Sequence, residues 1–126
     1  MNILVVAAHP DDEVLGCSAT MASLSRTHQV HIGILGEGVS SRHARRADAD
    51  RTALRRLQAQ ATTVGKLIGA RSVSFGELPD NRFDEVPLLE IVKRVEAWIA
   101  GRKPQAIYTH AGGDLNLDHQ LTFHLI

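Results

Sequence analysis

Residues 2–8, Asn-Ile-Leu-Val-Val-Ala-Ala, lead directly into residues 9–13, His-Pro-Asp-Asp-Glu. The first run is short, continuous and apolar without alternation, which predicts a strand buried on both faces, as in a parallel sheet. Pro10 lacks a backbone N–H and restricts the residue before it, so the strand ends here. One imidazole and three carboxylates therefore follow the strand at its carboxyl end, where open α/β sheets build their sites.

The rest of the chain repeats the alternation of strand and helix. Apolar periodicity and turn residues predict further strands at residues 29–35, 71–75 and 105–108, and helices at residues 13–26, 48–68, 87–101 and from 121 onward. We therefore expect an α/β fold, a Rossmann-like, mostly parallel sheet flanked by helices in a three-layer αβα arrangement. The 126 residues form one domain at most.

Composition excludes several classes of partner. Lys plus Arg and Asp plus Glu number 14 each, so the net charge gives no reason to expect a nucleic-acid partner. No apolar run approaches the length of a membrane span, so we expect no membrane partner either.

Cys17 is the only cysteine, which favours a reducing compartment, and we expect the protein in the cytoplasm. The first strand leads into no Gly-x-Gly-x-x-Gly turn, which disfavours a binder of dinucleotides or phosphorylated ligands.

Two motifs at opposite ends of the chain resemble the LmbE/PIG-L family of zinc-dependent N-deacetylases. Residues 8–13, Ala-His-Pro-Asp-Asp-Glu, are similar to its first motif, and residues 114–119, Asp-Leu-Asn-Leu-Asp-His, to its second metal motif. Family members are considerably longer, so we expect residues 1–126 to be a single domain of this kind that lacks the family's C-terminal portion. The sheet would then have an uncovered edge, which favours a homo-oligomer.

The resemblance implies metal-dependent hydrolysis. His9, Asp12 and His119 would hold Zn²⁺ or another divalent transition metal, since three protein ligands leave one coordination position open for chemistry. The family gives Asp11 the role of general base toward the metal-activated water. We therefore expect removal of an N-acetyl group from a small molecule, an N-acetylglucosamine-type amino sugar or its conjugate. The alternative is an inactive or non-enzymatic metal-binding module of the same fold.

The general acid stays open, because Asn116 stands where many relatives carry a histidine. Asparagine can hydrogen-bond an oxyanion but cannot transfer a proton, so the candidates for the acid are His110, Asp114, and Asp11 switching from base to acid. Asp118 is a candidate for orienting a histidine, as outer carboxylates of metal sites do, and also for capping a helix, and the two roles are compatible.

Residues in the loops after other predicted strands are candidates for substrate contacts. Glu37 and Arg42 follow the second strand in a region where relatives hold a sugar-like substrate, although the arginine does not align cleanly and a solvated basic loop is the alternative. Asp80 and Asn81 resemble a Pro-Asp-Asn/Gly stretch of the family, but also suit a simple turn. Asp114 is a further candidate for contact with the substrate.

Overall fold

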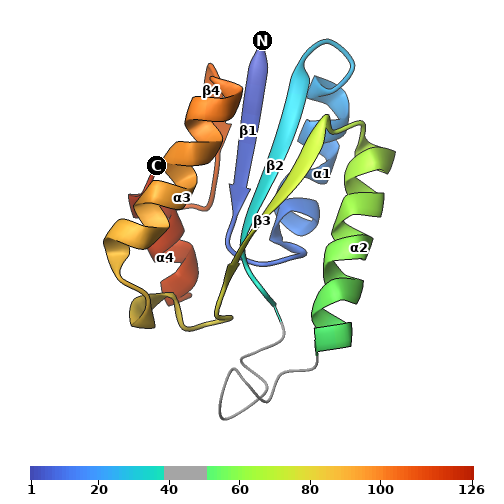
Figure 1. The fold of residues 1–126 in the computed structure, drawn as a ribbon. Helices are drawn as coiled ribbons and strands as arrows, with labels where there is room; N and C mark the ends of the chain where they lie inside the picture. The colour runs from blue at the N-terminus through green and yellow to red at the C-terminus, as the bar shows by residue number, and fades with distance from the viewer. Residues whose placement is uncertain (39–50) are drawn as a thin grey trace.

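The computed structural model describes residues 1–38 and 51–126, in which four parallel strands form one sheet with helices on both faces (Figure 1). In chain order the elements are β1 (Asn2–Ala7), α1 (Asp12–Leu24), β2 (Gln29–Gly36), α2 (Arg51–Ile68), β3 (Ser72–Leu78), the 3₁₀ helix η3 (Phe83–Glu85), α3 (Leu88–Arg102), β4 (Ala106–Tyr108) and α4 (Leu117–His124). The strand order is β3-β2-β1-β4. This is the α/β architecture that the alternating pattern predicted.

Strand β1 occupies an interior position in the sheet. Ile3 pairs with Val30 of β2 on one side and with Ala106 of β4 on the other. Every residue from Ile3 to Ala7 is at most 3% exposed, which accounts for the unalternating apolar sequence. Since all strands run in parallel, the acidic turn after β1 lies at the same edge as the ends of β3 and β4.

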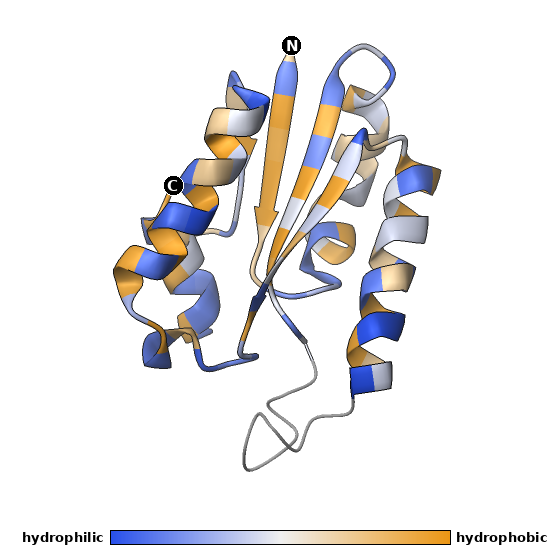
Figure 2. Ribbon diagram, viewed as in Figure 1, coloured by the Kyte–Doolittle hydropathy of each residue, from blue (hydrophilic) through white to orange (hydrophobic). Residues whose placement is uncertain are grey.

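Two hydrophobic cores lie on the two faces of the sheet, and β1 contributes to both because successive side chains of a strand point to opposite faces. The core under α3 and α4 includes Leu4, Val6, Ala8, Leu35, Phe83, Ile91, Val95 and Trp98. The core under α1 and α2 consists of Val5, Met21, Val30, Ile32, Ile34 and Ala61. Figure 2 shows this concentration of apolar residues along the strands. The predicted three layers are therefore present.

Two boundaries within the described residues differ from the sequence prediction by three residues or more. Strand β3 continues to Leu78, three residues beyond the predicted end at residue 75, because pairing with β2 resumes at Gly36 after an irregularity in the register. Helix α4 begins at Leu117, four positions before the predicted residue 121. Its N-cap is Asn116, whose side-chain oxygen accepts the backbone N–H of His119.

The helices agree with the prediction in position but not in every buried residue. The apolar periodicity that predicted the first helix includes Leu15, yet this side chain is 81% exposed. The predicted start of the second helix at residue 48 lies outside the described residues, and α2 is described from Arg51. None of the helices in the described part of the chain combines the length and the hydropathy that crossing a bilayer requires.

The contact between β2 and α3 gives a test of the fold. A Cβ atom at Gly33 would lie 2.5 Å from two ring carbons of Trp98, so Gly33→Ala forces the indole and α3 to shift. We expect the free energy of unfolding to fall by roughly 1–3 kcal/mol in urea denaturation. Gly101→Ala, on the same helix, is the control because nothing lies within 4 Å of its Cβ position, and it should leave stability unchanged or slightly raised. Equal losses in both variants would contradict the contact.

Candidate metal centre

The turn between β1 and α1 is tight and strained. The backbone N–H groups of Asp11 and Asp12 both donate to the carbonyl of His9, at 3.0 and 3.2 Å. Asp11 has φ 154° and ψ −25°, a conformation that non-glycine residues rarely adopt and that costs on the order of 1–3 kcal/mol. Such strain collects at functional sites, where the surrounding structure maintains it. The turn places His9, Asp11 and Asp12, three of four consecutive residues, at the edge of the sheet.

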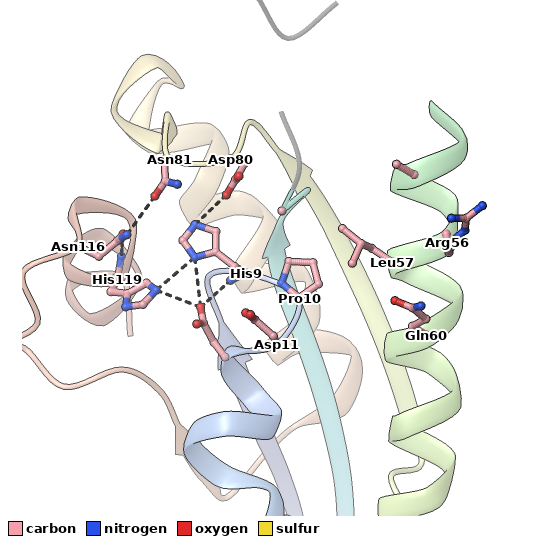
Figure 3. A pocket seen from close by; sticks show the side chains of 13 residues that line it. His9, Pro10, Asp11, Arg56, Leu57, Gln60, Asp80, Asn81, Asn116 and His119 are labelled. Carbon is pink, nitrogen blue, oxygen red and sulfur yellow. Dashed lines mark hydrogen bonds and ion pairs between the residues drawn. The ribbon is translucent and has the colours of Figure 1, made fainter. Parts of the chain in front are cut away.

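Three potential ligand atoms converge at this edge. His9 Nδ1 lies 3.3 Å from Asp12 Oδ2 and 3.2 Å from His119 Nε2, and the last two atoms are 3.0 Å apart (Figure 3). Tetrahedral zinc with bonds of 2.0–2.1 Å holds its ligand atoms roughly 3.3 Å from one another. These spacings and the nitrogen and oxygen donors fit one divalent ion. The structure thus brings together the three residues that the sequence motifs nominate.

The outward-facing nitrogens of both histidines meet carboxylates. His9 Nε2 lies 2.9 Å from Asp118 Oδ2 and 3.3 Å from Asp80 Oδ1, and His119 Nδ1 lies 2.7 Å from Asp114 Oδ2. Metal-ligating histidines usually have such a partner, which fixes the tautomer and the orientation of the ring. Asp118 is 1% exposed, and its other oxygen accepts the backbone N–H of Phe83 at 3.0 Å. Of its two predicted roles, the structure gives Asp118 contact with a histidine, while Asn116 caps the helix.

The electrostatics of this group favour a cation. Burial lowers the pKa of His9, but hydrogen bonds to Asp118 and Asp12 and the charges of Asp12 and Asp80 outweigh it and raise the pKa to about 10. Burial raises the pKa of Asp12, yet the hydrogen bond to His9 and the charge of His119 lower it overall. Without a metal ion, a proton on His9 therefore balances the carboxylates at neutral pH.

His110 lies beside the triad of His9, Asp12 and His119, but its ring has different hydrogen-bond partners from those of the two triad histidines. Its Nε2 accepts the backbone N–H of Ala8 at 2.9 Å, and its ring stacks on His119 with centroids 4.0 Å apart. Burial and the neighbouring charge of His119 lower its pKa. A nitrogen that accepts an N–H carries no proton, so in this arrangement only Nδ1 is available to donate one. The role of His110 as the acid stays a prediction.

Asn116 is engaged in two hydrogen bonds within the protein. Beyond its capping oxygen, its Nδ2 donates to Asn81 Oδ1 at 3.0 Å, which links α4 to the loop after β3. A contact between Asn116 and an oxyanion, which the second N–H of Nδ2 could make, stays a prediction. For Asp114, the observed partners are His119 and the backbone N–H of Asn116.

A pocket of about 610 Å³ opens in front of the triad. Its lining residues come from the turn after β1 and the start of α1, from the segment after β2, from α2, from the loop before η3, and from the start of α4 with the residue that caps it: His9, Pro10, Asp11, Asp12, Gly38, Ala53, Arg56, Leu57, Gln60, Asp80, Asn81, Asn116 and His119. Asp11 is exposed to this pocket next to Asp12 (Figure 3). Partial burial and the charge of Asp12 raise the pKa of Asp11 toward the range useful for proton transfer.

Two predicted substrate residues, Glu37 and Asp114, do not line this pocket. Glu37 is buried and lines a separate cavity of about 240 Å³ with Arg51 and Arg55 of α2. Arg42 lies outside the described residues. Sequence reasoning did not single out Arg56 and Gln60 of α2, which border the pocket of the triad.

Glu13 is the other residue that sequence reasoning missed. The sequence analysis gave it no role of its own within the motif at residues 8–13, yet only 4% of it is exposed, and burial raises its pKa. Its Oε2 accepts the backbone N–H of Asp11 at 3.0 Å. The signal was present in the sequence, because Glu13 lies four and eight positions before Cys17 and Met21, on the inner face of α1.

The fold and the site together define an α/β protein with a candidate metal centre at the carboxyl edge of its sheet. Residues 4–126 match the profile of the PIG-L family, described as GlcNAc-PI de-N-acetylase. The chain belongs to this family. No curated protein sequence matches the chain at a significant level.

Several solved structures share the fold. Their identities to the chain are below 25%, so they bear on architecture alone. The hydratase GalB from Pseudomonas putida KT2440, a 4-carboxy-2-hydroxymuconate hydratase, is 23% identical with a TM-score of 0.80, over 98% of this chain and 53% of its own. N,N'-diacetylchitobiose deacetylase from Pyrococcus horikoshii is 18% identical with a TM-score of 0.79, over 98% and 47%. The zinc-inhibited form of teicoplanin deacetylase Orf2 is 14% identical with a TM-score of 0.81, over 99% and 61%. The chain therefore spans about half the length of these proteins.

Removal of one histidine tests the ligand assignment. We expect His119→Ala to lose stoichiometric zinc, because only two of the three converging donors remain. His124→Ala is the matched control, since His124 is an exposed histidine on the same helix. Elemental analysis after dialysis should find metal in the wild type and the control alone. Full zinc content in His119→Ala would exclude this residue as a ligand.

Metal binding should release a proton. A ligand nitrogen must be deprotonated, and His9, with its pKa of about 10, holds a proton at pH 7 in the metal-free protein. We therefore expect zinc affinity to rise with pH, by about tenfold per unit between about pH 7 and 9. Calorimetric titrations in buffers of different ionisation enthalpy measure the release directly, and heats independent of the buffer would contradict it.

Proposed function

We propose that this chain carries the metal centre of a deacetylase that hydrolyses the N-acetyl group of an N-acetylglucosamine-type amino sugar or its conjugate. One observation carries the proposal: in a chain of the PIG-L family, His9, Asp12 and His119 converge with spacings that suit one ion. Zinc is the proposed metal, because these donors suit tetrahedral coordination with one open position, although another divalent transition metal fits the same set.

The residues around the triad would divide the work of amide hydrolysis. A bound ion would polarise the carbonyl and lower the pKa of water to ~7. Asp11, exposed to the pocket beside Asp12, would accept the proton of the attacking water through its carboxylate. Asp118 and Asp114 would hold the two ligand histidines in their orientations through the outward nitrogens.

The leaving amine requires a proton, and Asp11 is the best placed of the three candidates to return it. His110 Nε2 is occupied by the backbone of Ala8, and Asp114 is paired with His119. Asp11 would therefore act first as base and then as acid. This shuttle needs no histidine at position 116, which fits the asparagine found there.

The pocket suits a polar substrate of the size of a sugar. Its volume of about 610 Å³ lies within the range of small-molecule sites. Asp80, Asn81, Arg56 and Gln60 offer donors and acceptors to hydroxyl groups around the rim. The family description names GlcNAc-PI, and two fold relatives are described as deacetylases of chitobiose and teicoplanin.

A hydratase is a second candidate, because GalB has the same fold at 23% identity. Hydration also begins with activated water, but it adds water to a carbon–carbon double bond and expels no group. Release of acetate from N,N'-diacetylchitobiose separates deacetylation from hydration and from an inactive metal-binding module.

The general base has a direct test. Asp11→Asn should lower kcat for acetate release by ~10² or more while zinc content stays unchanged, because the amide cannot accept the proton. Asp84→Asn, at an exposed aspartate in η3, is the matched control and should have normal kinetics. Near-normal turnover by Asp11→Asn would exclude Asp11 as the base.

A further inference from the structure

We propose that Glu13 is a positioning residue that holds the backbone of Asp11 in its strained conformation and so keeps the Asp11 carboxylate available to the pocket. The inference rests on the proposed function in one respect, the role of Asp11 as base. It adds a residue that lies in neither the ligand triad nor the set of carboxylates behind it.

The burial of Glu13 is the first observation. Acids in the first turn of a helix normally stabilise it from the surface, where they interact with the helix dipole without losing hydration. Glu13 is instead 4% exposed, and it is one of only two buried residues of α1, with Met21. Burying a carboxyl group is unfavourable unless it is hydrogen-bonded, so the hydrogen-bond partner of Glu13 must help to stabilise its buried position.

The partner is the backbone N–H of Asp11, which lies 3.0 Å from Glu13 Oε2 and is shared with the carbonyl of His9. In a complete capping box, the N-cap side chain bonds to the helix while an acid in the first turn bonds back to the N-cap backbone. Glu13 makes a similar bond to the N-cap backbone from the second position of the helix rather than the third, and the side chain of Asp11 does not cap α1. The Asp11 carboxylate is thereby left for the pocket that it lines.

The backbone conformation explains why this bond is needed. At φ 154° a non-glycine residue is held in place only by its surroundings. Loss of the Glu13 acceptor would let the turn relax and move the carboxylate of Asp11. The ligands depend less on this bond, since Asp12 Oδ2 accepts the N–H of His9 and the ring of His9 contacts Asp118.

Two substitutions of similar size separate the hydrogen bond from packing. Glu13→Met fills the site without an acceptor, whereas Glu13→Gln retains an acceptor oxygen. We expect kcat for acetate release from N,N'-diacetylchitobiose to fall between about 10- and 100-fold in Glu13→Met, with KM and zinc content near those of the wild type. Glu13→Gln should retain most of the wild-type kcat. Glu90→Met, an exposed acid in the first turn of α3, controls for removal of a helix-terminal charge.

A second measurement does not depend on activity. Hydrogen exchange of the Asp11 amide, followed by NMR in the metal-free protein, should accelerate in Glu13→Met and stay slow in Glu13→Gln. Unchanged exchange and unchanged kcat in Glu13→Met would overturn the inference, as would equal losses in both variants. If the wild type releases no acetate, the proposed function fails, while the exchange rates still decide whether Glu13 holds the turn.

Discussion

Parallel pairing of β1 on both sides is the constraint on which the candidate site depends. Because β4 lies next to β1, the loop after β4 and the first turn of α4 lie beside the turn after β1. His9 and His119, which are 110 positions apart in the sequence, therefore come into contact. Asp118 then ties the arrangement together: one oxygen contacts His9 and the other accepts the N–H of Phe83 in η3. A single buried carboxylate thus joins three segments that are distant in sequence.

The charge distribution explains why such an assembly suits a cation. Asp12, Asp80, Asp114 and Asp118 surround two imidazoles within hydrogen-bonding distances. Carboxylates this close repel one another unless positive charge lies between them, and this is the reason the pKa of His9 is raised so far. A divalent ion in place of that proton would supply more positive charge at the same point. The same carboxylates that favour protonation of the metal-free protein would therefore favour the ion.

The sequence was most informative where the determinant was local. The apolar run of β1 and the turn after it predicted a buried parallel strand, and the two motifs identified the three residues of the triad as candidate ligands. Long-range pairing was not visible: β3 extends to Leu78 only because β2 supplies a partner, and Glu37 lines a cavity formed with α2 rather than the pocket of the triad. From sequence, Asp118 was a candidate both for orienting a histidine and for capping the helix, and the cap formed by Asn116 was not predicted. The backbone N–H of Phe83 in η3 accounts for the inward orientation of Asp118.

The fold alone does not select the reaction, because a hydratase and several deacetylases share it. Both reactions need activated water and a base, and the difference lies in the proton that an expelled amine must receive. His110, the imidazole predicted as a candidate for this proton transfer, has one nitrogen that accepts the backbone N–H of Ala8, and position 116 carries an amide side chain. Under the proposed function, Asp11 would therefore return the proton, and the bond from its backbone N–H to Glu13 would keep its carboxylate at the pocket. On this argument the strained turn at Asp11 is part of the chemistry rather than a by-product of ending a strand.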